Sequence, residues 1–158
     1  MEWGIVGAMD ISGSGMRGYL GSYLHQLDDK GRLSLPSSFR REAPEGPLVL
    51  VHVFPDALTL YPQESWAEVE ARLRELLRLQ PQSRPFVLRV TANAVEVAPD
   101  KAGRILVPQR LQDAVGIDGS ALVVGAIDRI EIWNPDRFTA ATAPSTADAE
   151  RYLHHVFG

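Results

Sequence analysis

The sequence predicts a mainly β protein with short helices, of the α+β class, built from two tandem copies of one module. Residues 28–40 and 100–112 align without a gap, 72 positions apart. The same register continues downstream, where residues 58–61 (LTLY) align with residues 130–133 (IEIW). Short apolar segments follow in each copy, as expected for strands. A repeat of about forty residues buries little core alone, so the two copies are expected to share one.

Each copy is expected to begin with a strand that runs into a charged turn. The first strand is placed at residues 19–27. Its counterpart is placed at residues 86–97, partly because residues 88–90 alternate between apolar and charged side chains. The turn that follows has the pattern D-x-x-G-R in both copies, at residues 28–32 and 100–104. Such a turn is expected to close a β-hairpin with a bulge.

A second strand leaves each turn and ends at a proline. Pro36 and Pro108 end it because proline lacks the N–H group that a strand ladder needs. Proline is also favoured in the first turn of a helix. The expected strands are residues 32–35 and 104–107, and the expected helices are residues 37–42 and 109–115.

The remainder of each copy predicts two apolar strands and a helix. Asn134-Pro135-Asp136 is typical of a helix N-terminus. The helix after the first copy has an apolar stripe, which is expected to form core or a subunit interface. The stripe consists of Trp66, Val69, Leu73, Leu76 and Leu77. The expected segments are strands at 48–54, 57–61, 121–127 and 129–133, a helix at 63–79, and a short helix in the tail at 147–157.

The domain organisation follows from the repeat. A Gly- and Ser-rich stretch without periodicity precedes the first copy and is expected to be a flexible extension. The expected divisions are the extension at 1–18, the first repeat at 21–66, a helix and linker at 67–92, the second repeat at 93–138, and a C-terminal tail at 139–158.

The repeated turn is the candidate functional site. Asp28 and Asp100 suit the first position of a turn because their carboxylates accept nearby backbone N–H groups, and Gly31 and Gly103 permit positive φ. Two interpretations of the arginines stay open. Each of Arg32 and Arg104 pairs with its own aspartate, or each projects outward to bind guanine or phosphate.

Composition and the placement of charged residues restrict the kinds of function that the chain is expected to have. The net charge is −4, yet the chain has only two lysines, Lys30 and Lys101, and each lies in one copy of the turn. This placement favours locally basic turns that contact phosphate on an acidic body. The chain has no cysteine, which excludes disulfides and thiol chemistry. The four histidines lack metal-ligand spacing and no nucleophile motif occurs, so neither an enzyme nor a cofactor is expected.

These residues resemble a known family. Residues 21–40, with Gly21, His25 and LDDKGRLSLP, resemble the start of the MraZ family. Residues 100–111 and the segment GAIDRIEIW at 125–133 resemble its second half. The resemblance spans about residues 19–138, and two copies of the motif at the right separation make it specific. Family members begin near the match to Tyr19, so residues 1–18 are an addition to the module.

The resemblance implies a fold, a partner and a function. The fold is an AbrB-like swapped-hairpin, double-split β-barrel in which the two SpoVT/AbrB-like halves form a pseudodimer. The function is that of a cytoplasmic, nucleoid-associated transcriptional regulator. It assembles as a ring-shaped homo-oligomer and binds tandem G-rich promoter repeats, usually repressing the division and cell-wall gene cluster. Lys30 and Arg32 match the DNA-contacting loop best, whereas Lys101 lies one position earlier in its turn. The alternative is an AbrB/MazE-like antitoxin or protein-interaction module.

A ring would also solve an affinity problem. A single acidic subunit with few cations in each turn would bind duplex DNA weakly. Repeating the turns around a ring lets one assembly engage successive sites, and this avidity raises the overall affinity. Sites on one face of the duplex are then expected to recur about every 10 bp.

Overall fold

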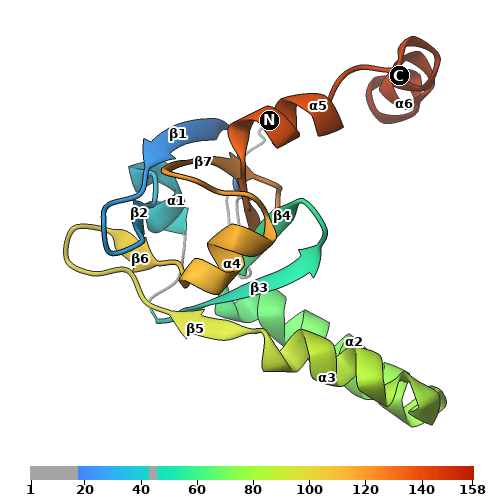
Figure 1. Ribbon diagram of the computed structural model, residues 1–158. Helices are drawn as coiled ribbons and strands as arrows, with labels where there is room; N and C mark the ends of the chain where they lie inside the picture. Colours follow the sequence, from blue (N-terminus) through green and yellow to red (C-terminus); the bar gives the residue numbers. More distant parts are fainter. Residues whose placement is uncertain (1–17, 43–45) are drawn as a thin grey trace.

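Eight antiparallel strands, arranged in two sheets, form the centre of the protein in a computed structural model that describes residues 18–42 and 46–158 (Figure 1). The expected extension at 1–18 lies outside the described residues except for Gly18. The larger sheet has the order β1-β7-β8-β4-β3-β5, and the smaller one pairs β2 with β6. The strands are β1 Ser22–Gln26, β2 Arg32–Ser34, β3 Leu48–Phe54, β4 Ala57–Tyr61, β5 Val95–Val97, β6 Arg104–Leu106, β7 Ser120–Gly125 and β8 Ile130–Trp133.

The two repeats exchange strands. β1 of the first repeat pairs with β7 of the second, and β5 of the second pairs with β3 of the first. The small sheet also takes one strand from each repeat. A shift of 72 positions converts β1, β3 and β4 into β5, β7 and β8, so the sheet order is the same when it is followed from either end. The described strands therefore have a pseudo-twofold arrangement about the β4–β8 pair.

One apolar core serves both repeats. It lies between the six-stranded sheet and a cover made of β2, β6 and the short helices α1 (Ser37–Glu42) and α4 (Gln109–Ala114). Burying a large apolar side chain contributes about 1.5–3 kcal/mol, so a shared core stabilises what neither repeat could stabilise alone. Its fully buried members come from both copies, among them Leu33, Phe39, Leu50, Leu58, Leu60, Ile105, Val107, Val123, Ile130 and Ile132.

A helical hairpin covers part of the opposite face of β3 and β4. It consists of α2 (Gln63–Leu79), the 3-10 turn η1 (Pro81–Ser83) and α3 (Arg84–Ala92), and its far end projects away from the sheets (Figure 1). Trp66 and Val90 pack with Val49, Val51 and Tyr61 in a second cluster. The apolar stripe of α2 is thus core at Trp66 and partly buried further along.

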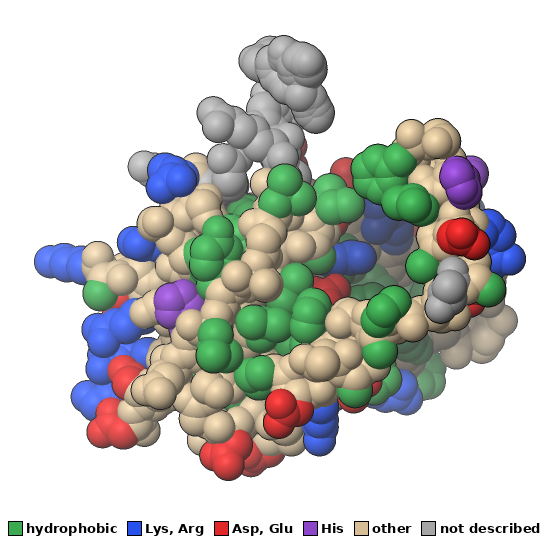
Figure 2. All heavy atoms as spheres, turned by 90° about the horizontal axis from the view of Figure 1, so that it is seen from above, with side chains coloured by type: hydrophobic (Ala, Val, Ile, Leu, Met, Phe, Trp, Pro, Cys, Tyr) green, Lys and Arg blue, Asp and Glu red, His purple; other side chains and the backbone are tan. Residues whose placement is uncertain are grey.

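Two helices form the C-terminal tail. α5 (Pro135–Ala141) begins as predicted, because the Asn134 side chain accepts hydrogen bonds from the N–H groups of Asp136 and Arg137. α6 (Thr146–Phe157) stands apart from the sheets (Figure 1). Figure 2 shows apolar side chains on α6 and over the neighbouring side of the body, with a hollow between them. The large exposed apolar residues of α6 are Tyr152, Leu153, Val156 and Phe157, and Leu20 and Leu24 are exposed at and just before β1.

The prediction of a strand over residues 86–97 was wrong for most of its length. Residues 84–92 form α3, and only Val95–Val97 is a strand. Pro85 lies at the start of the helix, where its missing N–H has no partner to lose. Val87 and Val90 are buried at helical spacing while Leu88 is exposed, so the alternation at 88–90 came from the edge of an amphipathic helix.

Each charged turn was predicted to close a β-hairpin with a bulge, but its flanking segments pair with each other only next to the turn. Among the described residues on the two sides of the turn at residues 28–32, the only β-bridge joins Leu27 and Leu33. β1 then pairs with β7, whereas β2 pairs with β6. Exchange between the repeats thus replaces local strand pairing. The mixed α+β class with an antiparallel sheet agrees with the predicted fold class.

A search of the described helices for a segment long and apolar enough to cross a membrane finds none.

Adjacent residues on β6 test the shared core. Ile105 is 0% exposed and Leu106 is 54% exposed. Ile105→Ala is expected to lower the free energy of unfolding by about 2–5 kcal/mol, because it leaves a cavity beneath the β2–β6 pair. Leu106→Ala is expected to change it by less than about 1 kcal/mol. Chemical denaturation followed by circular dichroism measures both, and equal losses would contradict a core at this position.

Candidate nucleic-acid interface

The turn at residues 28–32, called the first turn, is held by one carboxylate. The Asp28 Oδ1 atom accepts hydrogen bonds from the backbone N–H groups of Lys30 (3.0 Å) and Arg32 (2.8 Å). The backbone closes around it, with Asp28 N–H donating to the Arg32 carbonyl and Gly31 N–H donating to the Asp28 carbonyl, each at 3.0 Å. The Asp28 side chain therefore bridges the two ends of the turn.

The turn at residues 100–104, called the second turn, repeats this geometry. Asp100 Oδ1 accepts from the N–H groups of Ala102 (2.9 Å) and Arg104 (3.0 Å). Asp100 N–H donates to the Arg104 carbonyl at 2.8 Å, and Gly103 N–H donates to the Asp100 carbonyl at 2.9 Å. The two copies of the sequence motif thus form the same set of hydrogen bonds.

Each turn requires glycine for two reasons. Gly31 and Gly103 have φ of 82° and 79°, a region that other residues rarely adopt. A β-carbon on Gly31 would also lie 2.9 Å from Nε2 of Gln112, and one on Gly103 would lie 2.5 Å from Nη1 of Arg40. A side chain at either glycine would meet both backbone strain and a residue from the other repeat.

The arginines pair with their own aspartates. Arg32 Nε lies 2.6 Å from Asp28 Oδ2, and Arg104 Nε lies 3.1 Å from Asp100 Oδ2. In the described part of the chain the hydrogen bonds of both side chains run through Nε, and of the terminal nitrogens only Nη1 of Arg104 lies within ion-pair distance of a carboxylate, at 3.7 Å from Asp28. The side chains are 33% and 34% exposed, so solvent reaches them. Bracing and outward presentation are therefore compatible in this geometry.

These hydrogen bonds lower the pKa of both aspartates below the ordinary value of 3.8. For Asp28 the largest cause is the hydrogen bond from the Arg32 backbone N–H, and partial desolvation opposes it. For Asp100 the largest cause is the equivalent bond from Arg104. Both carboxylates are charged near neutral pH and hold their arginines in place.

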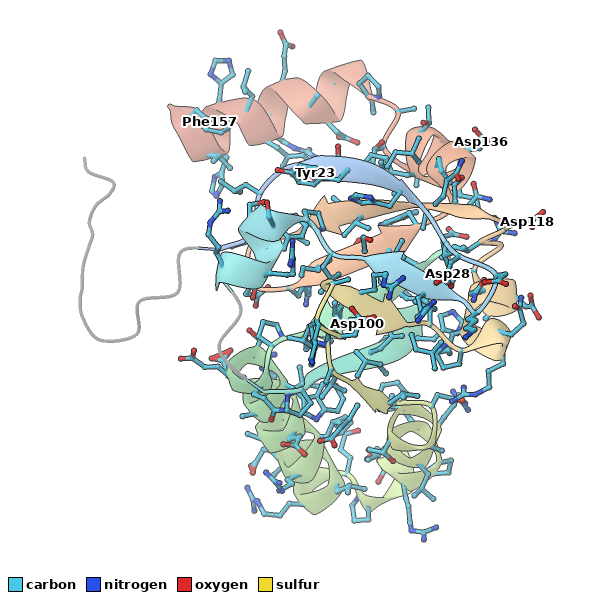
Figure 3. All side chains as sticks on the ribbon, turned by 90° about the vertical axis from the view of Figure 1, so that its left-hand side faces the viewer. Tyr23, Asp28, Asp100, Asp118, Asp136 and Phe157 are labelled. Atoms are coloured by element: carbon cyan, nitrogen blue, oxygen red, sulfur yellow. The ribbon has the colours of Figure 1, made fainter. Side chains whose placement is uncertain are left out.

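The fold brings the two turns together. Leu35 N–H donates to the Gly103 carbonyl, and Val107 N–H donates to the Gly31 carbonyl, each at 2.9 Å. Arg104 Nη1 also lies 3.7 Å from Asp28 Oδ2. Figure 3 shows the labelled Asp28 and Asp100 on the same side of the molecule, at opposite ends of the short antiparallel β2–β6 pair. All the predicted site residues therefore belong to one surface, where Lys and Arg side chains gather (Figure 2).

Two residues of this surface were missed by the sequence analysis. Arg40 on α1 and Gln112 on α4 each lie against the glycine of the other repeat's turn. Gln112 is buried and donates from Nε2 to the Val107 carbonyl at 2.9 Å. They are 72 positions apart, so the repeat alignment itself contained the signal.

No group of three or more His, Cys, Asp or Glu side chains among the described residues could hold a metal ion.

Comparisons with known proteins agree with the repeated turns. Residues 19–88 and 90–154 match the family described as "MraZ protein, putative antitoxin-like". The chain is 40% identical over 122 residues to "Transcriptional regulator MraZ" of Thermomicrobium roseum, an alignment that covers 77% of this chain and 85% of that protein. It is 37% identical over 138 residues to the protein of the same name from Herpetosiphon aurantiacus, covering 87% and 96%.

The turn carboxylates predict a pH dependence of stability. A carboxylate with a lowered pKa contributes stability above its unfolded pKa, and the contribution is lost as the pH falls through the folded pKa. The melting temperature of the wild type is therefore expected to exceed that of Asp28→Asn at pH 5–8, and the difference is expected to shrink below pH 3.8. Thermal unfolding followed by circular dichroism measures this difference.

Asp29→Asn is the matched control, because it removes the neighbouring charge without removing a side-chain hydrogen bond of the described turn. A difference between wild type and Asp28→Asn that already closes above pH 5 would contradict the assignment.

Proposed function

Because the chain belongs to the MraZ family, we propose that it is a transcriptional regulator that binds double-stranded DNA through its two turns. The observation that carries the proposal is the side-by-side placement of Arg32 and Arg104. Each is fixed by its own aspartate and is partly open to solvent. Fixing the stem of an arginine removes conformational freedom before binding, so less entropy is lost when the ligand arrives.

The chemistry of these side chains suits a duplex. The planar end of an arginine donates two parallel hydrogen bonds to O6 and N7 of guanine in the major groove. Lys30 and Lys101 are exposed on the same turns and supply contacts to phosphate. The roles of Asp28, Asp100, Gly31 and Gly103 are to shape the turns, not to contact the bases.

The target and the fold subclass extend this proposal. The resemblance to the family supports sequence-specific binding to tandem G-rich repeats, repression of the division and cell-wall gene cluster, and association with the nucleoid. The exchange of β1 and β5 between the repeats supports a swapped-hairpin, double-split barrel. We also propose that residues 21–66 and 93–138 are the two SpoVT/AbrB-like halves, with 67–92 as helix and linker.

Self-assembly completes the proposal. A ring-shaped homo-oligomer would repeat the turns and gain affinity through avidity. Exposed apolar side chains on the helical hairpin and the tail, including Leu79, Phe86, Leu88, Leu153 and Phe157, support association with further copies.

A second candidate function is an AbrB/MazE-like antitoxin or protein-interaction module. The antitoxin-like description of the matching family favours it. So does the exposed apolar face of α6, which could bind a partner protein. The two turns, each with an arginine braced by its own aspartate, make DNA binding the stronger candidate.

Arg32→Ala tests the DNA interface. It is expected to weaken binding to a duplex with tandem G-rich repeats by about 10- to 100-fold, because a bidentate contact to guanine contributes about 1–3 kcal/mol. Its effect on stability is expected to be below about 1 kcal/mol, since the ion pair is at the surface. Fluorescence anisotropy measures affinity, and circular dichroism confirms folding.

Arg151→Ala is the control for Arg32→Ala. Arg151 is an exposed arginine on α6 that pairs with Asp148 at 2.9 Å, so the change removes the same charge and a similar ion pair elsewhere. Unchanged affinity of Arg32→Ala, or an equal loss in Arg151→Ala, would count against recognition by the first turn.

Multi-angle light scattering tests the assembly. The purified chain is expected to elute as a closed oligomer of fixed mass at micromolar concentration, because exposed apolar faces favour association. A mass of 17.4 kDa, that of one chain, would reject the ring.

A further inference from the structure

The two turns differ in the residue that covers their glycine. Arg40 and Gln112 occupy the fourth positions of the equivalent helices α1 and α4. A β-carbon on Gly103 would lie 2.5 Å from Nη1 and 2.6 Å from Cζ of Arg40, so the guanidinium lies against the second turn. The neutral amide of Gln112 lies against the first turn in the same way. The second turn therefore has an additional positive charge beside it, from Arg40, whereas the residue at the equivalent place beside the first turn is neutral.

This difference adds to one in the turns themselves. Residues 28–32 hold two acidic and two basic side chains, whereas residues 100–104 hold one acidic and two basic side chains. With the covering residue included, the first turn is neutral and the second carries a net charge of +2. No carboxylate in the described part of the chain forms an ion pair with Arg40. Its charge is therefore not compensated within the described structure.

The arginines of the two turns are also held differently. Arg32 Nε lies 2.6 Å from Asp28 Oδ2, the shortest ion pair of the two turns. Arg104 lies 3.1 Å from Asp100 and 3.7 Å from Asp28, so it is shared between two carboxylates at longer distances. A tightly held arginine presents its terminal nitrogens in one direction, which suits recognition of a base edge. An exposed charge without a carboxylate partner suits the phosphate backbone, where the gain comes from release of counterions.

We propose that the two turns divide the work of DNA recognition, with the first turn contacting bases and the second turn, through Arg40, anchoring the phosphate backbone. The inference rests on the proposed function and assigns different parts of it to the two turns. Arg40 is the residue that makes them unequal, because its counterpart in the repeat is Gln112. Phosphate contacts fix position and affinity, whereas base contacts provide sequence preference.

Replacing Arg40 with glutamine, the residue at the equivalent position of α4, tests whether the two turns divide the contacts to DNA. Arg40→Gln places in α1 the residue that α4 already has, and Arg40→Lys keeps the charge. Arg151→Gln removes an equal charge from α6. Anisotropy titrations from 50 to 300 mM salt would use two 30-bp duplexes, one with tandem G-rich repeats and one of scrambled sequence. Thermal unfolding of each variant confirms that it is folded.

Arg40→Gln is expected to weaken binding to both duplexes by the same factor, about fivefold. It is also expected to reduce the slope of log K against log salt concentration by about one for each bound chain. Arg40→Lys is expected to restore the slope, and Arg151→Gln to leave it unchanged. The preference for the G-rich duplex is expected to survive in Arg40→Gln and to be lost in Arg32→Ala. A wild-type slope in Arg40→Gln, or loss of its preference, would overturn the division. A wild type that does not prefer the G-rich duplex would instead reject the proposed target.

Discussion

Exchange of strands between the two repeats is the constraint on which the rest of the structure depends. β1 and β5 each complete the sheet of the other repeat, and β2 pairs with β6 across the pseudo-twofold axis. The main core belongs to neither repeat alone, because buried side chains of both copies pack in it, while a smaller cluster lies beneath the helical hairpin. The same exchange brings two turns that are 72 positions apart in sequence to one side of the molecule. Strand exchange therefore both forms the shared core that stabilises the fold and brings the residues of the candidate site together.

Within that frame, each turn is set by a carboxylate, a glycine and a helix from the other repeat. The carboxylate fixes the backbone and the arginine stem. The glycine admits positive φ and leaves room for Gln112 or Arg40. A change in α1 or α4 can therefore alter a turn that is distant in sequence. This coupling explains how two turns of nearly equal backbone geometry can carry different charge.

The sequence predicted most elements where local physics was decisive. The helix at Gln63–Leu79 and the strands at Leu48–Phe54 and Ala57–Tyr61 were found at their observed limits, because prolines and apolar runs mark them. Residues 86–92 were assigned to a strand because three alternating residues cannot distinguish a strand from the edge of an amphipathic helix. The hairpin was predicted because the turn is local, but partner choice depends on burial across the whole chain.

By itself, the sequence determined that the chain is a duplication, that Asp28, Gly31, Asp100 and Gly103 shape two turns, and that each turn carries an arginine beside its aspartate. These features depend on residues within a few positions of one another, so their chemistry is visible in the order of the chain. Only the tertiary structure decided that the strands are exchanged, that the two turns lie side by side, and that Arg40 covers one while Gln112 covers the other. Such contacts join residues that are about 60 to 100 positions apart, and their choice depends on which pairing buries the shared core.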